Sequence, residues 1–234
     1  ALPLMQVAHH RDHPMQVEAM FLGTAGLLDV ETMPQRQREA ALSDAYFTAL
    51  RREYAYLAHK FSLTAMPRTA WRFMRLRPQN SPYIRLSQLA TLYCSRRADL
   101  SRVASCATLD EVGGALATEV GDYWRTHYSF GNESKANAKR LSAASVQLLV
   151  VNAVVPMLYA YGRHRQDETL IQRAATLMEE LPPEDNTYIR LWKECGVKAE
   201  NAADTQALIQ LHRRYCERKE CLRCRFGYYL LKGG

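Results

Sequence analysis

Glycine and proline are scarce in this chain of 234 residues, with 11 and 9 copies, and they nowhere gather into a linker or low-complexity tail. An extended disordered region is therefore not expected. Cysteine is also sparse: the six copies are too few for a disulfide scaffold in a chain of this length, which favours a reducing, cytoplasmic location. Glycine-rich nucleotide motifs are absent, and the first residues of the given sequence do not have the pattern of a signal peptide. Because the chain does not begin with methionine, we expect a piece of a longer protein.

Strict apolar–polar alternation, the mark of a half-buried strand, is missing as well. Apolar residues instead recur at helical spacing, which predicts an all-α protein. The proline at position 82 suits the first turn of a helix. The expected helices cover residues 15–28, 35–61, 86–94, 108–127, 168–181, 186–195 and 203–217.

One stretch, "SAASVQLLVVNAVVPMLYAYG", is apolar almost all round. A membrane span needs about 20 predominantly apolar residues, but Gln147, Asn152 and Pro156 interrupt this run, so we expect no membrane contact. It predicts a buried central helix at about 141–162, kinked at Pro156 because proline lacks a backbone N–H. The remaining helices would pack around it as one bundle-like domain, 1–234. A division into two lobes, 1–130 and 131–234, is the alternative.

Five peptides, in this order, carry a family resemblance: "EAMFLGTAGLL", "RLRPQNSPYIRLSQLATLY", "LLVVNAVVPMLYAYG", "LPPEDNTYIRLWKECGV" and "ADTQALIQLHRRYCERKECLRC". Together they resemble the C-terminal part of the bacterial family called domain of unknown function 2851. The resemblance implies no activity and no catalytic residue. It does imply an N-terminal region, absent from this chain and similar in its acidic pattern to restriction-endonuclease-like folds, as a partner. It also places the last three cysteines in a shared motif.

Those three cysteines have the spacing C-x4-C-x2-C near the end of the chain. Thiolates at such spacing can converge on a soft metal. His212 precedes Cys216 by one helical turn, so a zinc site of His212, Cys216, Cys221 and Cys224 is one hypothesis. Cys195 as fourth ligand would instead suit an iron–sulfur cluster. Packed free thiols and a disulfide or redox role are the alternatives.

Arginine is concentrated in two places. The net charge is +7, and residues from 213 onward contribute seven basic and two acidic side chains. On both sides of two prolines, "RLRPQNSPYIR" presents guanidiniums that could hold phosphate or carboxylate. The alternative is a structural loop whose arginines bind helix-end carbonyls. The candidate anion or nucleic-acid residues are Arg75, Arg77, Asn80, Arg85, Arg213, Arg214, Arg218, Arg223 and Arg225.

The sequence identifies no reaction. Our first hypothesis is a helical nucleic-acid-associated or interaction module that works beside the absent N-terminal domain. A structural or oligomerisation scaffold is the alternative, and an enzyme with a site at the arginine loop is the least favoured. We do not expect the chain alone to be an enzyme, since no nucleophile, base and orienting acid can be assembled from its motifs.

Overall fold

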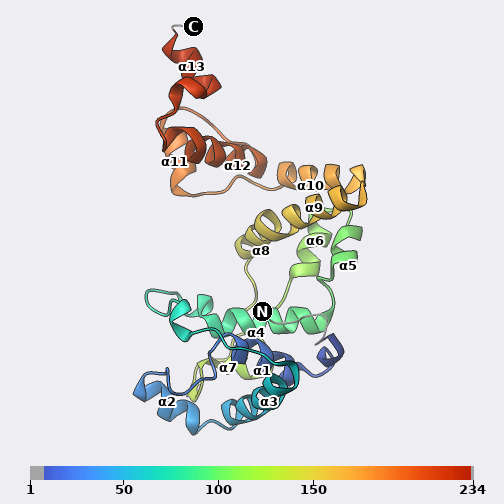
Figure 1. Cartoon of the computed structure of the whole chain (residues 1–234), viewed down its shortest axis with the longest axis vertical. Coiled ribbons are helices and arrows are strands. Elements are labelled where there is room, and N and C mark those ends of the chain that lie inside the picture. The colour runs from blue at the N-terminus through green and yellow to red at the C-terminus, as the bar shows by residue number, and fades with distance from the viewer. Residues whose placement is uncertain (1–7, 233–234) are drawn as a thin grey trace. The chain divides into compact units, whose positions relative to one another are not determined.

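The computed structural model describes residues 8–232 and divides into two compact units. The first unit takes residues 1–103 and 114–143, and the second takes 104–113 and 144–234, as the colours of Figure 1 allow the reader to follow. The all-α prediction is confirmed, because helices dominate and the only sheet in the described residues has two short strands. Each unit is treated separately below.

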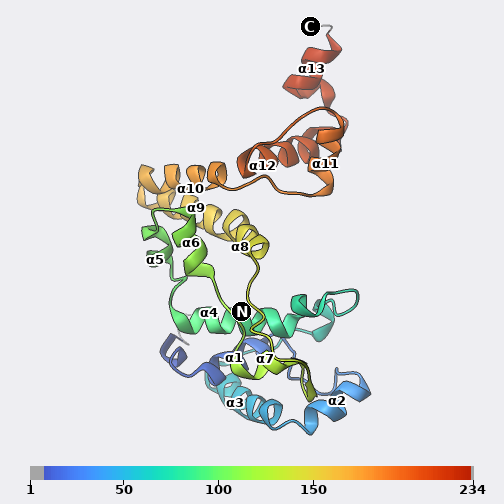
Figure 2. The ribbon, with the colours of Figure 1, turned by 180° about the vertical axis from the view of Figure 1, so that it is seen from behind.

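The first unit is built around α1 (Pro14–Thr24), which packs against both α3 (Ala45–Phe61) and α4 (Pro82–Ser95) (Figure 2). Its other elements are η1 (Ala8–His10), α2 (Gln35–Leu42), η2 (Arg68–Ala70), η3 (Pro78–Asn80), α7 (Asp122–Thr126), β1 (His127–Ser129) and β2 (Asn132–Glu133). Helices α5 (Leu100–Ser105) and α6 (Leu109–Leu116) straddle the division between the units.

Two of the expected long helices are broken by local chemistry. The run 35–61 splits at Asp44, whose carboxylate accepts a hydrogen bond from the Phe47 N–H and so caps α3. The helix predicted at 108–127 is divided into α6 and α7. A hairpin of β1 and β2, which the sequence pattern did not predict, follows α7 directly. Gly131 turns that hairpin at φ +69, where an added Cβ would stand 2.3 Å from the Ala40 carbonyl oxygen. A glycine is therefore required at this turn.

Aromatic side chains form the centre of the first unit. Trp124 is fully buried and stacks on Tyr83 with ring centroids 5.6 Å apart. Phe130 from the hairpin meets Trp124 at 5.0 Å and Phe47 of α3 at 4.7 Å. Offset and edge-on ring contacts of this kind add to the stabilisation from area burial. The hairpin is thereby fixed against α3 and α4.

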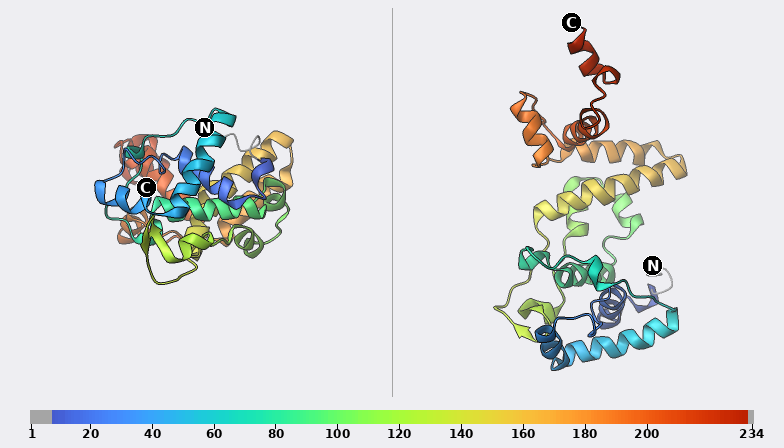
Figure 3. Two further views of the ribbon diagram at one scale, coloured as in Figure 1. Left: turned by 90° about the horizontal axis from the view of Figure 1, so that it is seen from below. Right: turned by 60° about the vertical axis from the view of Figure 1, so that its left-hand side comes forward.

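The second unit contains a helical pair and a smaller C-terminal group. Helices α9 (Val155–Arg165) and α10 (Glu168–Glu180) run side by side after a tight turn (Figure 3), which Asp167 makes possible by capping α10. The other elements are α8 (Ala143–Leu149), the π-helical turn η4 (Val150–Val154), α11 (Thr187–Glu194), α12 (Ala202–Leu211), the π-helical turn η5 (His212–Cys216), η6 (Cys221–Arg223) and α13 (Arg225–Leu231).

The helix expected at about 141–162 exists as the continuous stretch α8–η4–α9, but its predicted burial is wrong. Only 22% of its most apolar 18-residue stretch is buried. Side chains on a single stripe of the helix, which includes Val150, Val154 and Leu158, are buried against protein, and most of the others face solvent. By length and composition this helix could cross a membrane, a criterion that core helices of soluble proteins also meet. The irregularity expected before Pro156 takes the form of η4, where the Asn152 side chain donates to the Leu148 carbonyl at 2.9 Å.

Candidate functional site

The segment 62–81, called here the arginine loop, is fixed at its base to the end of α1. The Met66 N–H donates to the Thr24 carbonyl at 2.8 Å, and the Trp71 indole donates to the Ala25 carbonyl at 2.8 Å. Gly26 has φ +70, and a Cβ there would stand 2.1 Å from the Met66 carbonyl oxygen. The small residues at 23–26 thus allow close packing, and the loop is anchored to the end of α1.

Arg68 connects the arginine loop to the core. Its guanidinium is buried, donates to the Tyr83 hydroxyl at 3.0 Å and to the Gln37 side chain at 3.2 Å, and lies 4.3 Å from the Phe73 ring centre. Burial raises the pKa of the Tyr83 phenol, and this effect exceeds the lowering of the pKa by the charge and hydrogen bond of Arg68. Tyr83 is therefore a core residue and Arg68 is its structural partner.

The four residues predicted around the two prolines, three in this loop and one in α4, fall into two kinds. Arg85 donates to the side-chain oxygens of Gln88 at 2.9 Å and of Asn80 at 2.7 Å, so these acceptors are side-chain amides at the start of α4 rather than helix-end carbonyls. Arg75 and Arg77 are exposed, and no side-chain partner for either occurs among residues 8–232. Arg72, which was not among the predicted residues, is also exposed, and its side chain has no partner in the same described range.

Exposed apolar side chains alternate with these three arginines. Met74 is 83% exposed, while Phe73 and Leu76 are each 39% exposed. Arg75 adopts φ +59, a left-handed conformation that costs a non-glycine residue about 1–2 kcal/mol. The tip of the loop thus combines free positive charge, exposed apolar surface and a constrained backbone.

The predicted basic residues of the C-terminus lie in the second unit. Arg213 lies 5.3 Å from the Tyr188 ring centre, Arg214 lies 6.0 Å from that of Tyr215, and Arg223 pairs with Glu220 at 3.3 Å. Arg218 and Arg225 are exposed, with no side-chain partner in the described chain. The set forms a solvent-facing basic segment.

The predicted metal ligands Cys216 and Cys221 belong to η5 and η6, two elements in contact, and Cys224 follows η6 directly. Burial, followed by the charges of Cys224 and Cys221, raises the pKa of Cys216. The ring of His212 contacts residues other than the cysteines. Its Nδ1 lies 3.5 Å from a Glu217 carboxylate oxygen, and its ring centre lies 4.9 Å from the ring centre of Tyr188. No group of three or more His, Cys, Asp or Glu side chains within residues 8–232 is arranged to hold a metal. Zinc or an iron–sulfur cluster, with Cys195 as ligand or not, stays a prediction.

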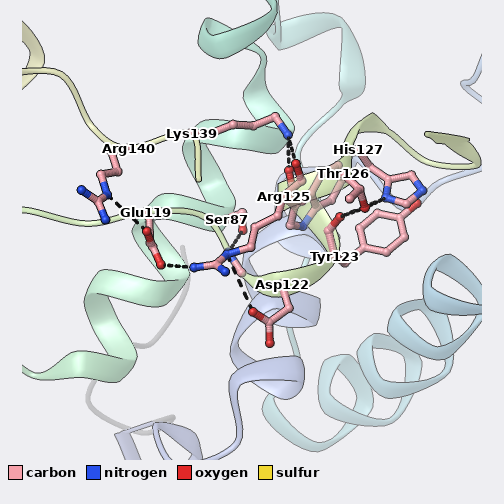
Figure 4. Close-up of polar contacts among 11 residues, drawn as sticks. Ser87, Glu119, Asp122, Tyr123, Arg125, Thr126, His127, Lys139 and Arg140 are labelled. Carbon is pink, nitrogen blue, oxygen red and sulfur yellow. Dashed lines mark hydrogen bonds and ion pairs between the residues drawn. The ribbon is translucent and has the colours of Figure 1, made fainter. Parts of the chain in front are cut away.

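A polar network surrounds α7 in the first unit (Figure 4). Glu119 accepts hydrogen bonds from Arg125 at 2.5 Å and from Arg140 at 3.4 Å, and the first of these lowers its pKa most. The buried Lys139 ammonium donates to the Trp124 and Arg125 carbonyls at the end of α7. Ser87 accepts from the Gly121 N–H at 3.0 Å. The network holds α7 in place.

A cavity of about 420 Å³ adjoins this network and is lined by residues that include Arg97, Glu119 and Arg140. The Arg97 guanidinium donates to the Ala117 carbonyl at 2.7 Å, and Arg140 pairs with Glu119. Both cavity arginines are thus already bound to protein acceptors. Arg75 and Arg77 of the arginine loop differ from them in this respect.

A second cavity, of about 370 Å³, lies between α8 and the segment before α11 in the second unit. Its acidic residues are also bound: Asp185 accepts two hydrogen bonds from Arg190 at 2.8 and 2.9 Å, and Glu184 accepts one from Gln206 at 2.5 Å. Asn186 caps α11 through the Tyr188 and Ile189 N–H groups. These contacts give Glu184, Asp185 and Asn186 a structural role.

The fold and its exposed basic segments define an all-α protein with an arginine-rich loop at the N-terminal end of α4. The chain belongs to the family described as protein of unknown function DUF2851, whose model matches residues 1–187. The cysteine motif lies beyond this match. No curated protein and no solved structure matches the chain.

Proposed function

We propose that this chain is a nucleic-acid-binding module whose arginine loop holds a single strand. The observation that carries the proposal is the presence of three exposed, partner-free guanidiniums, Arg72, Arg75 and Arg77, on one anchored loop. Guanidinium groups match the geometry of phosphate oxygens, and arginines without protein acceptors keep their donors for a ligand.

The apolar residues of the loop favour a single strand over a duplex. Phe73 and Met74 stand next to each other between Arg72 and Arg75, and both are exposed. Unpaired bases offer their faces to such side chains, and stacking contributes about 1–3 kcal/mol per base. In a duplex the base faces are covered by the neighbouring base pairs. A duplex would therefore contact only the arginines of the loop.

The C-terminal basic segment supports the same function from the second unit. Residues from 213 onward carry seven basic and two acidic side chains. Such a segment attracts polyanions at long range and raises the association rate at low salt. An N-terminal domain of the kind that the family resemblance implies would be the natural partner of this binding activity.

Fluorescence anisotropy with a labelled single-stranded oligonucleotide at several salt concentrations tests the proposal. Arg75→Gln combined with Arg77→Gln should weaken binding and reduce the slope of log affinity against log salt by about 0.7 for each lost phosphate contact. Arg36→Gln combined with Arg52→Gln is the matched control, because both are exposed, partner-free arginines of the described first unit. Equal binding by the two double variants would contradict the proposed site.

A second variant separates charge from stacking. Phe73→Leu keeps an apolar side chain but removes the ring, so it should weaken single-strand binding by about 1 kcal/mol and leave the salt slope unchanged. An equal loss with a duplex of the same length would mean that the ring does not read an exposed base.

Self-association is the second candidate function, and the exposed apolar helix Ala143–Arg165 favours it. Leu148 is 54% and Tyr159 50% exposed on a stretch of mean hydropathy 1.7. Exposed apolar surfaces of this kind mark interaction sites. Sedimentation should then show a dimer that Leu148→Lys dissociates, whereas a monomer at every concentration tested would contradict this function.

A further inference from the structure

Cys221 and Cys224, the C-x2-C pair near the C-terminus, differ in their exposure to solvent. Cys221 is exposed at the first residue of η6, whereas Cys224 is 6% exposed and immediately precedes α13. The Cys224 N–H donates to the Cys221 carbonyl at 3.2 Å, which closes a turn of four residues. The Cα atoms at the ends of such a turn lie within about 7 Å, and disulfides join Cα atoms about 4.4–6.8 Å apart.

Helix α13 fixes this turn through Gly227. A Cβ on Gly227 would stand 2.5 Å from the Cys221 carbonyl oxygen and 3.0 Å from its Cα. The Tyr228 N–H also donates to the Cys224 carbonyl at 2.7 Å. The helix backbone therefore packs directly on the cysteine turn and keeps its two ends together.

We propose that Cys221 and Cys224 form a thiol–disulfide exchange site for small anionic disulfides. The Cys221 thiolate attacks one sulfur of the disulfide RSSR, which forms a Cys221–SR bond and releases RS⁻. The Cys224 thiolate then attacks the Cys221 sulfur, forms the internal disulfide and releases the second RS⁻. The two protons lost by the cysteines are taken up by the two released thiolates, so the small disulfide is reduced to two thiols while the cysteine pair is oxidised.

The order of attack follows from exposure, and the ligand class follows from charge. Only the thiol at the surface can meet a dissolved disulfide, so Cys221 acts first and Cys224 second. Arg218, Lys219 and Arg225 flank the pair in sequence, and their positive charge attracts an anionic reactant.

The test uses the full chain, reduced and then exposed to oxidised glutathione, with intact and peptide mass spectrometry. The wild type should lose two hydrogen masses and yield a Cys221–Cys224 cross-link. Cys224→Ala should stop at a glutathione adduct on Cys221, and Cys221→Ser should lose the cross-link entirely. Cys195→Ser is the control, because Cys195 is an exposed cysteine outside the turn, and it should leave the cross-link intact.

Two further arms examine the geometry and the charge. Gly227→Ala should slow closure, so that the Cys221 adduct accumulates before the cross-link forms. The cationic disulfide cystamine should react more slowly than oxidised glutathione at low salt, and the difference should shrink at high salt. A cross-link to Cys216, an adduct that forms as fast on Cys195 as on Cys221, or faster reaction with cystamine would overturn the proposal. So would bound zinc that shields all three tail thiols until a chelator is added.

Discussion

The indole N–H of Trp124 donates a hydrogen bond to the carboxylate of Glu18 inside the first unit. Glu18 is 5% exposed on α1, and Tyr46 and Ser87 also form hydrogen bonds with its side chain. Burial exceeds the effect of these donors and raises the pKa of Glu18 to about 7. A carboxyl group at the centre of a helical core thus titrates near neutral pH.

The first prediction concerns the pH dependence of stability. Because the folded-state pKa of Glu18 lies above its ordinary value of 4.5, the folded state binds the proton more tightly. The unfolding free energy from this group should therefore fall as pH rises from about 4.5 to about 7, by about 3 kcal/mol in total. Glu18→Gln should remove that fall in denaturant titrations at a series of pH values. Glu39→Gln, at an exposed position, should retain it; a pH profile unchanged in Glu18→Gln would contradict the assignment.

The second prediction concerns Asp44, which joins α3 to the hairpin. Its carboxylate caps α3 and also accepts hydrogen bonds from the Tyr123 hydroxyl at 2.5 Å and the Gly131 N–H at 2.9 Å. Asp44→Ala should lower the unfolding free energy by about 2–4 kcal/mol, the sum of a lost cap and lost charged hydrogen bonds. Asp44→Asn keeps a capping oxygen and should recover about 1 kcal/mol of the loss. Equal stability of the two variants would mean that capping contributes nothing here.

Helical periodicity was enough to predict the fold class, but the breaks depended on contacts remote in sequence. The division at Asp44 is supported by Tyr123 and Gly131, which only the folded chain brings near it. The hairpin was missed because its strands are very short and gain their stability from the aromatic contacts of Phe130.

The burial of apolar residues was the least predictable property. The segment "FGYYLL" near the C-terminus is rich in large apolar side chains, yet Phe226 is 68% and Tyr229 is 65% exposed. Composition shows that a segment can be buried but not whether a partner surface exists for it. For the candidate site, the sequence located Arg75 and Arg77, yet their lack of protein partners could be seen only in the structure.

The third prediction concerns Lys139, a lysine that is 2% exposed and has φ +44. Its ammonium donates to the Arg125 carbonyl at 2.8 Å and to the Trp124 carbonyl, and it lies 4.2 Å from the Tyr128 ring centre. Lys139→Met keeps the volume but leaves the Trp124 carbonyl without this donor, whereas the Arg125 carbonyl still accepts from the Asn137 N–H at 2.9 Å. The change should cost about 1–3 kcal/mol. Lys135→Met at an exposed neighbouring position is the control, measured by urea unfolding. A cost no greater than that of the control would show that water replaces the ammonium.

The last prediction concerns Gly26, on which the anchoring of the arginine loop depends. Alanine there would combine the strain of φ +70 with a Cβ 2.1 Å from the Met66 carbonyl oxygen, so the base of the loop must move. Gly196 is the matched control, because it has φ +84 but no atom within 4 Å of its added Cβ. Gly196→Ala should therefore cost only the backbone strain, about 1–2 kcal/mol, and Gly26→Ala should cost more.

Gly26→Ala should also affect ligand binding if the loop binds as proposed. A loop that has lost its foundation must be ordered when the strand binds, and we expect single-strand affinity to fall by about 1 kcal/mol or more. Gly196→Ala should bind like the wild type in the same anisotropy titration. If Gly26→Ala is destabilised yet binds with unchanged affinity, the arginines act as mobile charges and the anchoring at α1 serves the fold alone.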